Sequence, residues 1–239
     1  MRRCTHHALF WILLALCPQL GRATDGAPPQ RILILGDSMM RIPVSALENE
    51  FTKHTGVEVR PFTALGTGLA RLDVLDWMDR IERLVASFQP DAAVMFIGAN
   101  DRQPMRVKEG VVIRPEQDGW EEEYARRVGQ AMDLLGAAGA VRVFWLELPD
   151  MKDGHLHENA NLINAIFERE AGKRPFVTLF RTRPILTRKP GVFTLYVINE
   201  RGLPLSVRDR DGVHLSRGGA ELLASALAES LWPDNPDAP

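Results

Sequence analysis

Residues 30–38 of the chain read QRILILGDS, an uninterrupted apolar run followed by a glycine, an acid and a serine. A short continuous apolar run that ends in glycine is typical of a strand buried on both faces of a parallel sheet. We therefore expect a central strand over residues 30–35, and the apolar spacing of residues 39–54 predicts a helix directly after it. Ser38 then stands at the carboxyl end of a buried strand, where it opens that helix.

The alternation of strand and helix continues along the chain. Further strands are predicted at residues 57–62, 92–97, 141–146 and 175–180, and helices at residues 69–88, 120–138, 158–171 and 218–231. Strands that alternate with helices of this length form parallel crossover units. The pattern predicts an α/β fold with three α/β/α layers, doubly wound around a mostly parallel five-stranded sheet. Two further segments, 105–114 and 192–208, contain glycine turns between β-type residues and are predicted to be inserted β-hairpins.

The N-terminal segment has the pattern of a secretory signal peptide. Arg2 and Arg3 precede an apolar run over residues 8–17 (ALFWILLALC), and small residues follow at Gly21 and Ala23. This run is too short to span a membrane. We expect a signal peptide over 1–23, a linker over 24–29, one globular domain over 30–232 and a disordered tail over 233–239. The mature protein is expected to be periplasmic or secreted, without stable membrane insertion.

Composition narrows the chemistry. Both cysteines, Cys4 and Cys17, lie in the expected signal peptide, so the mature chain is expected to use neither thiol catalysis nor a Cys-ligated metal. A lipoprotein site at Cys17 is disfavoured because Leu16 stands where a small residue is wanted. Removing residues 1–23 also removes three arginines and changes the net charge from −2 to −5. A slightly acidic chain without a basic run is not expected to bind nucleic acid.

Three glycine-containing motifs follow the first three predicted strands, and they read Gly36-Asp37-Ser38, Gly66-Thr67-Gly68 and Gly98-Ala99-Asn100-Asp101. The carboxyl ends of parallel strands meet at one edge of the sheet, where ligands collect. Asp211 and His214 precede the last predicted helix and can reach the same edge. A serine nucleophile, a histidine base and a carboxylate that orients the base are the groups that acyl transfer requires. Backbone N–H groups and the neutral amide of Asn100 can stabilise an oxyanion.

Gly-Asp-Ser, a following glycine, Gly-x-Asn-Asp and Asp-x-x-His stand in the order that defines the SGNH (GDSL-type) hydrolases, and the chain resembles that family over about residues 30–232. It looks most like a branch of secreted or periplasmic members with poorly defined substrates. The resemblance implies a flavodoxin-like domain with Ser38 as nucleophile, His214 as base and Asp211 as its support. It also implies an oxyanion hole formed by the N–H groups of Ser38 and Gly68 and by the Asn100 side chain, with Gly66 as the alternative to Gly68.

Other polar residues have structural interpretations. Asp37 and Asp101 are expected to cap the backbone of their own turns rather than to act as catalytic acids. His155 and His157 lie near acidic residues, but side chains two positions apart on a helix do not share a face. We therefore expect no metal site there, and no cofactor for the protein as a whole.

Three functions fit these residues. The first is a secreted serine esterase that removes O-acyl groups, most plausibly acetyl, from a small molecule or from a polysaccharide or peptidoglycan of the cell envelope. The second is an O-acyltransferase, which would pass the same acyl-serine intermediate to a sugar hydroxyl. The third is a non-catalytic polysaccharide-binding assembly protein, which is disfavoured because Ser38, Gly68, Asn100, Asp211 and His214 are all present.

Overall fold

The computed structural model describes residues 28–107, 110–137, 139 and 141–233. The expected signal peptide and nearly all of the expected tail lie outside the described residues. The domain contains one five-stranded sheet in the order β2-β1-β3-β6-β7, and every pair of neighbours is parallel. Its strands are β1 (Arg31–Gly36), β2 (Glu58–Thr63), β3 (Ala92–Phe96), β6 (Arg142–Leu146) and β7 (Val177–Phe180). The predicted doubly wound, flavodoxin-like sheet is confirmed.

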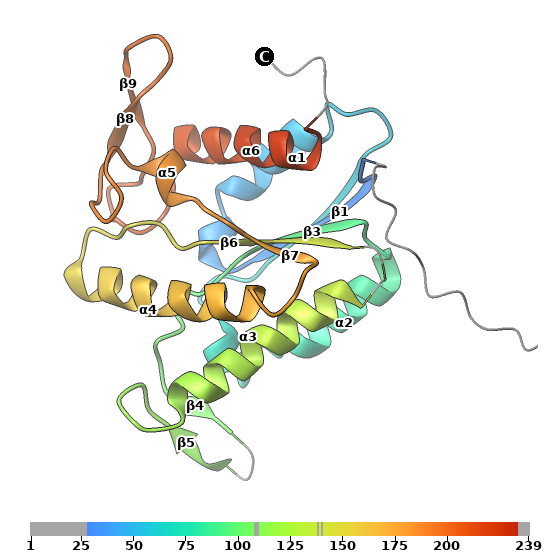
Figure 1. Cartoon of the computed structure of the whole chain (residues 1–239), viewed down its shortest axis with the longest axis vertical. Helices are drawn as coiled ribbons and strands as arrows, with labels where there is room; N and C mark the ends of the chain where they lie inside the picture. Colours follow the sequence, from blue (N-terminus) through green and yellow to red (C-terminus); the bar gives the residue numbers. More distant parts are fainter. Residues whose placement is uncertain (1–27, 108–109, 138, 140, 234–239) are drawn as a thin grey trace, which may run out of the picture.

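Helices cover both faces of this sheet (Figure 1). The two on one face, which pack against each other, are α1 (Pro43–Phe51) and α6 (Arg217–Leu231). The three on the other face are α2 (Trp77–Phe88), α3 (Trp120–Gly136) and α4 (Gly154–Ala171). Because both faces are covered, every residue of β3 is buried. Among the described residues, no helix is both long and apolar enough to cross a membrane.

Helix starts differ from the predicted ones where a local cap decides them. Residues 38–40 form a separate 3-10 turn, η1 (Ser38–Met40), and α1 begins at Pro43. Proline favours the first helical turn because its fixed φ suits the helix and its missing N–H is not needed there. The predicted helix over 69–88 is likewise divided into η2 (Leu69–Arg71) and α2, because Asp76 caps the N–H groups of Met78 and Asp79.

Both predicted hairpins are present. The first pairs β4 (Met105–Arg106) with β5 (Val112–Ile113), and the second pairs β8 (Tyr196–Ile198) with β9 (Pro204–Ser206). The first lies between β3 and α3, whereas the second lies between the short helix α5 (Arg183–Leu186) and α6. Both hairpins therefore lie on the side of the sheet where the carboxyl ends of β3 and β7 are found. Figure 1 shows the two hairpins far apart on that side, one near α4 and α3 and the other near α6.

Candidate active site

Ser38, His214 and Asp211 form a hydrogen-bonded chain at the carboxyl edge of the sheet. Nε2 of His214 lies 2.9 Å from Oγ of Ser38, and Nδ1 lies 2.7 Å from Oδ2 of Asp211. Ser38 directly follows β1, whereas the other two lie in the connection that leads into α6. When the neutral imidazole carries its proton on Nδ1, it donates to Asp211 and Nε2 accepts from the serine hydroxyl. This arrangement can remove the proton of Ser38 during attack on a carbonyl.

The Asp211 carboxylate is held by the loop that carries it. Its Oδ1 accepts hydrogen bonds from the N–H groups of Val213, at 2.8 Å, and His214, at 3.0 Å. Burial raises the pKa of Asp211, but the hydrogen bonds from the His214 ring and from these two N–H groups outweigh it and lower the pKa to about 2. Asp211 is therefore ionised near neutral pH and faces Nδ1 as a carboxylate.

The turn that carries Ser38 is tied to the neighbouring strand by Asp37. The buried Asp37 carboxylate accepts from the N–H of Met39 at 2.8 Å and from the N–H of Gly98 at 3.1 Å. Asp37 caps its own turn, as predicted, and also joins the connections that follow β1 and β3. Ser38 opens one 3-10 turn rather than α1, so the dipole of a long helix does not point at it.

Gly66 and Gly68 serve different purposes. Gly66 is exposed in a turn with φ of +70°, a conformation that favours glycine. Gly68 is buried, and a Cβ added to it would lie 1.9 Å from Oδ1 of Asp101. The Asp101 carboxylate accepts from the N–H groups of Leu69, at 3.1 Å, and Ala70, at 3.0 Å. Asp101 therefore holds the segment after Gly68 and does not cap its own turn, which corrects the sequence-based interpretation.

The segments that carry Gly68 and Asn100 lie on either side of the Ser38 turn. On one side, the N–H of Ala64 donates to the carbonyl of Gly36 at 3.0 Å. On the other side, Gly36 pairs with Phe96 in the β1–β3 register, and Asn100 follows in the next turn, where it is half-buried. The structure thus brings these three segments together at one edge of the sheet. The roles of Gly68 and Asn100 as oxyanion donors remain predictions.

Sequence reasoning missed two buried residues of α3. The Tyr124 hydroxyl donates to Oδ2 of Asp101 at 2.8 Å, and the Arg127 guanidinium donates to the carbonyls of Leu69, at 3.1 Å, and Ala70, at 3.0 Å. A signal was present, since Tyr124 and Arg127 are three positions apart and share the buried face of the helix. A charged residue on an otherwise apolar face indicates a specific partner.

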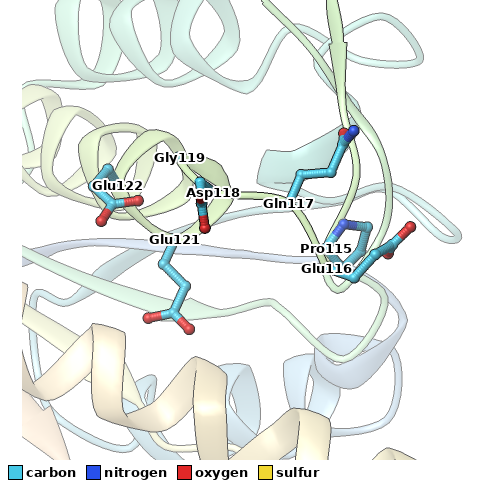
Figure 2. A pocket seen from close by; sticks show the side chains of 7 residues that line it. All are labelled: Pro115, Glu116, Gln117, Asp118, Gly119, Glu121 and Glu122. Carbon is cyan, nitrogen blue, oxygen red and sulfur yellow. The ribbon is translucent and has the colours of Figure 1, made fainter.

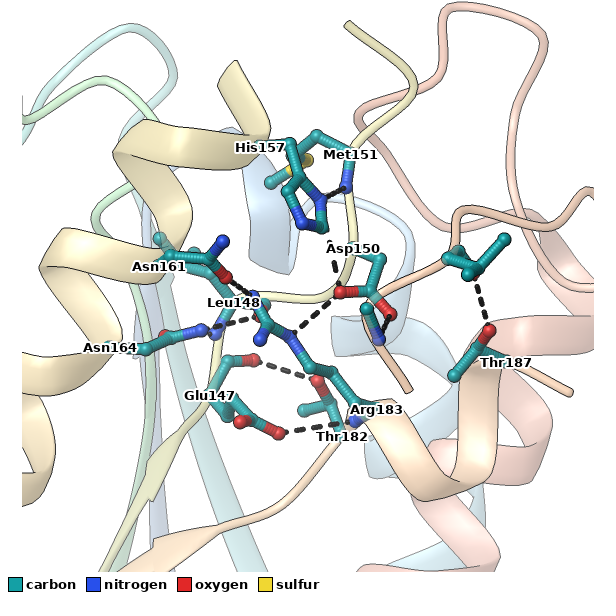
Figure 3. A network of polar contacts seen from close by, with 12 residues as sticks. Glu147, Leu148, Asp150, Met151, His157, Asn161, Asn164, Thr182, Arg183 and Thr187 are labelled. Carbon is teal, nitrogen blue, oxygen red and sulfur yellow. Dashed lines mark hydrogen bonds and ion pairs between the residues drawn. The ribbon is translucent and has the colours of Figure 1, made fainter. Parts of the chain in front are cut away.

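A second polar network surrounds Asp150 (Figure 3). It lies next to the loop that carries His214, because the N–H of Lys152 donates to the carbonyl of Gly212 at 3.1 Å. The buried Asp150 carboxylate lies 3.1 Å from Nε of Arg183 and accepts from the N–H of Gly191 at 3.1 Å. His157 Nδ1 accepts from the N–H of Met151 at 3.3 Å, so this imidazole has a local partner. Within the part of the chain that the structure describes, no three His, Cys, Asp or Glu side chains are arranged to hold a metal ion.

Two surface hollows lie away from these catalytic candidates. The first, of about 390 Å³, is lined by residues 115–119 and by Glu121 and Glu122 at the start of α3 (Figure 2). The second, of about 650 Å³, lies between α5 and the β8–β9 hairpin and includes Leu222 of α6. Neither is lined by Ser38, Asp211 or His214. The candidate site is therefore identified by the hydrogen-bonded chain and not by the size of a cavity.

Comparison with known proteins agrees with this fold. A family model described as a protein of unknown function (DUF459) matches residues 31–230. No curated protein matches the chain. Among solved structures, the C-terminal catalytic domain of Streptococcus pneumoniae peptidoglycan O-acetyltransferase A, determined with a methylsulfonyl adduct, is 13% identical with a TM-score of 0.52, over 87% of this chain and 95% of that chain.

Two further solved structures are similar. A member of the lipolytic G-D-S-L family from Veillonella parvula is 15% identical with a TM-score of 0.56, over 83% of this chain and 96% of that one. A lipase from a goat rumen metagenome is 14% identical with a TM-score of 0.52, over 84% of this chain and 96% of that one. At these identities the likeness establishes the fold, and the resemblance to SGNH (GDSL-type) hydrolases is confirmed at that level.

Proposed function

The chain belongs to the DUF459 family, and we propose that it is a serine esterase of the SGNH type that hydrolyses O-acyl esters. One observation carries this proposal: the hydrogen-bonded chain from Ser38 through His214 to Asp211. The three residues come from opposite ends of the domain, so their meeting is a property of the tertiary fold. A serine hydroxyl within hydrogen-bond reach of an imidazole that a carboxylate orients is the arrangement that activates serine as a nucleophile.

In this mechanism, Ser38 Oγ attacks the ester carbonyl carbon while His214 Nε2 takes the hydroxyl proton. The tetrahedral intermediate collapses, the bond to the alcohol oxygen breaks, and Nε2 returns the proton to that oxygen. Water then attacks the acyl carbon and gives a proton to Nε2. The second tetrahedral intermediate collapses, the bond to Ser38 Oγ breaks, and Nε2 passes its proton to Oγ as the carboxylic acid leaves. The ionised Asp211 stabilises the imidazolium that forms in each half of the reaction.

The oxyanion hole in this proposal consists of the Ser38 and Gly68 N–H groups and the Asn100 amide. Gly68 is preferred to Gly66 because it is buried and immediately precedes a segment whose N–H groups the Asp101 carboxylate holds. Donors that are fixed in advance stabilise the developing negative charge without reorganising during the reaction. Gly66 is exposed and has a purely conformational reason to be glycine.

The proposed substrates are O-acyl esters, acetyl esters above all, on a polysaccharide or peptidoglycan of the cell envelope. The location rests on the signal-peptide pattern of residues 1–23, with its positive start and short apolar run. The two hairpins lie on the same side of the sheet as Ser38 and His214, where loops on a rigid scaffold can contact a polymer. The third function, a non-catalytic binding protein, has no use for the serine–imidazole hydrogen bond.

A serine-directed fluorophosphonate tests the nucleophile. We expect mass spectrometry to locate the label on Ser38, and Ser38→Ala to abolish both labelling and p-nitrophenyl acetate turnover with the melting temperature nearly unchanged. Ser87→Ala is a matched control, because Ser87 is an exposed serine on α2 and should have no effect. A label on another serine, or no label on active protein, would show that the assignment is wrong.

An O-acyltransferase would use the same acyl-serine intermediate. The catalytic domain of the S. pneumoniae peptidoglycan O-acetyltransferase has a fold similar to that of this chain. The products separate the two activities. The protein is incubated with an acetyl donor, with and without peptidoglycan fragments or oligosaccharides as acceptors. If the protein is an esterase, the rate of acetate release should be the same with and without the acceptor. Appearance of O-acetylated sugar with a matching fall in free acetate would identify a transferase.

A further inference from the structure

Two arginines are buried in the described part of the chain, Arg127 and Arg208, and each side chain is 3% exposed. Burying a guanidinium is costly unless its donors are satisfied. Both side chains direct donors at main-chain carbonyls, which include carbonyls of the two segments that follow or contain the proposed catalytic groups. Arg127 also pairs with Glu123 at 2.7 Å and donates to the carbonyl of Arg106. The two arginines lie on different elements, one in the middle of α3 and the other just after β9.

Arg127 grips the segment that begins at Gly68. Its Nη1 donates to the carbonyls of Leu69, at 3.1 Å, and Ala70, at 3.0 Å, while the Asp101 carboxylate accepts from the N–H groups of these same two residues. Both polar groups of each residue's main chain are therefore held by the buried side chains of Arg127 and Asp101. The peptide that presents the Gly68 N–H is joined to this segment through the Cα of Gly68, so the contacts at Leu69 and Ala70 hold the chain on one side of that peptide.

Arg208 grips the loop that carries Asp211 and His214. Its Nη2 donates to the carbonyl of Val213 at 2.7 Å and to that of Gly212 at 3.3 Å, and its Nε donates to the carbonyl of His214 at 3.4 Å. Its Nη1 donates to the carbonyl of Asp150, on the segment that leads into α4. One planar side chain therefore fastens the loop to a neighbouring part of the fold.

The loop approaches that neighbouring segment closely. The N–H of Lys152 donates to the carbonyl of Gly212 at 3.1 Å, and a Cβ added to Gly212 would lie 2.4 Å from Cβ of Lys152. Burial lowers the pKa of Arg208 to about 10, although the negative charges of Asp150 and Asp211 act in the opposite direction and raise it. The guanidinium therefore stays charged near neutral pH while it is surrounded by carbonyl oxygens.

We propose that Arg127 and Arg208 are positioning residues of the reaction: Arg127 orients the peptide of the oxyanion donor Gly68, and Arg208 orients the loop that presents the His214 imidazole. Neither acts on the substrate directly. The inference rests on the proposed function, because the hydrogen bonds of Arg127 and Arg208 serve the reaction only if Gly68 and His214 act as proposed. A small displacement of a catalytic group lowers the rate strongly, since reaction requires near-attack geometry.

The test replaces each guanidinium by a side chain of similar length without donors, in Arg127→Met and Arg208→Met. Arg126→Met and Arg210→Met are matched controls, because these neighbouring arginines are exposed. We expect the rate of fluorophosphonate labelling of Ser38 and kcat for p-nitrophenyl acetate to fall about 100-fold in the two buried variants, with KM little changed. The two controls should keep the rates of the unmodified protein.

The pH profile distinguishes the two positions from a merely structural role. Arg127→Met should lower kcat/KM at every pH and keep the shape of the profile, because the base is intact. Arg208→Met should change the shape of the profile as well as its height, because it displaces the imidazole that acts as the base. Partial unfolding would instead scale labelling with the folded fraction measured by near-ultraviolet circular dichroism, in both variants alike.

The outcomes separate this inference from the proposed function. Absence of labelling and turnover in the unmodified protein would disprove the proposed function. Labelling of the unmodified protein together with unchanged rates in folded Met variants would overturn the positioning roles. If a Met variant does not fold, Arg127→Lys and Arg208→Lys keep the charge but lose the planar donors, and we expect an intermediate rate. Lys variants that fold and react at the unmodified rate would equally overturn the inference.

Discussion

At the scale of single residues, the Asp211 carboxylate accepts hydrogen bonds from two N–H groups and from the His214 ring. We expect Asp211→Asn to lower kcat, but by less than His214→Ala, because the loop contacts still place the imidazole. His214→Ala should cost about as much as Ser38→Ala, since the two act as a unit. Steady-state kinetics of the three variants tests this order. An Asp211→Asn variant with unchanged kcat would mean that another group orients the base.

The pKa of Asp211 also has a consequence for stability. Its value of about 2 in the folded state is below the ordinary value of 3.8 for an aspartate, so the folded protein binds this proton less readily than the unfolded chain does. The contribution of Asp211 to stability is therefore present above about pH 4 and is lost as the pH falls toward 2. An acid limb of the activity at higher pH must consequently come from a group other than Asp211.

Asn100 offers a second residue-level prediction. If its amide donates to the oxyanion, Asn100→Ala should lower kcat by about 100-fold or more with little change in KM, because the interaction forms chiefly in the transition state. Asn159→Ala is a suitable control, since Asn159 is a half-buried residue of α4, like Asn100, and accepts a hydrogen bond from Arg102. A change confined to KM would make Asn100 a substrate-binding group instead.

The sequence predicted the residues with motif signals but not those that support them. Ser38 and His214 could be named because one follows a predicted strand and the other precedes the last predicted helix, and both positions lie at the carboxyl edge of a parallel sheet. The partners of Asp101 could not, because Leu69 and Ala70 are distant in sequence and no local pattern encodes which turn a buried carboxylate reaches. Arg208 was missed for a related reason, since its acceptors are carbonyls, which every residue possesses.

At the scale of elements, the first hairpin follows Asn100 directly and is anchored by the buried Met105. We expect that replacing the tip between Met105 and Ile113 by a tight turn spares hydrolysis of a small aryl acetate and impairs activity on a larger acylated polysaccharide. The reason is that loops on a rigid scaffold supply the walls of a binding site. Rates on both substrates provide the test.

Equal loss on the two substrates would show that this hairpin supports the fold or Asn100 rather than selecting the substrate. Shortening the β8–β9 tip around Gly202 provides a comparison, because that hairpin leaves the same edge of the sheet. A selective effect of one tip and not the other would identify which wall contacts the polymer.

Element order was predictable, whereas several element boundaries were not. The apolar spacing over 39–54 and 69–88 continues through a turn in each case, so periodicity alone merged two short elements into one helix. The boundaries follow from local chemistry at Pro43 and at the Asp76 cap. The same holds for α4, which begins earlier than predicted because Asp153 caps the N–H of Leu156.

At the scale of the whole molecule, the buried Asp37 links stability to pH. Burial raises its pKa from 3.8 to about 7, although hydrogen bonds from Met39 and Gly98 oppose the shift. Between these two values the folded state keeps a proton that the unfolded chain has released. Stability therefore falls as the pH rises through this window, because the folded state binds more protons than the unfolded state.

Urea unfolding at several pH values between about 4 and 7.5 measures this slope. Asp37→Asn should flatten it, because the amide does not titrate. Asp209→Asn, at an exposed position, should leave the slope as it is in the unmodified protein. An unaltered slope in Asp37→Asn would assign the pH dependence to another buried group, and Asp101 is the next to examine because burial also raises its pKa.

The parallel sheet also determines how the protein can be attached to a surface or to a fusion partner. β1 starts, and α6 finishes, at the amino edge of the sheet, where Arg142 at the start of β6 donates to the carbonyl of Leu231 at 3.3 Å. Ser38 and His214 occupy the opposite edge. A bead, sensor surface or fusion protein coupled beyond either end of the folded domain would therefore lie on the side away from Ser38 and His214, and the immobilised protein would present Ser38 outward to a large polymer.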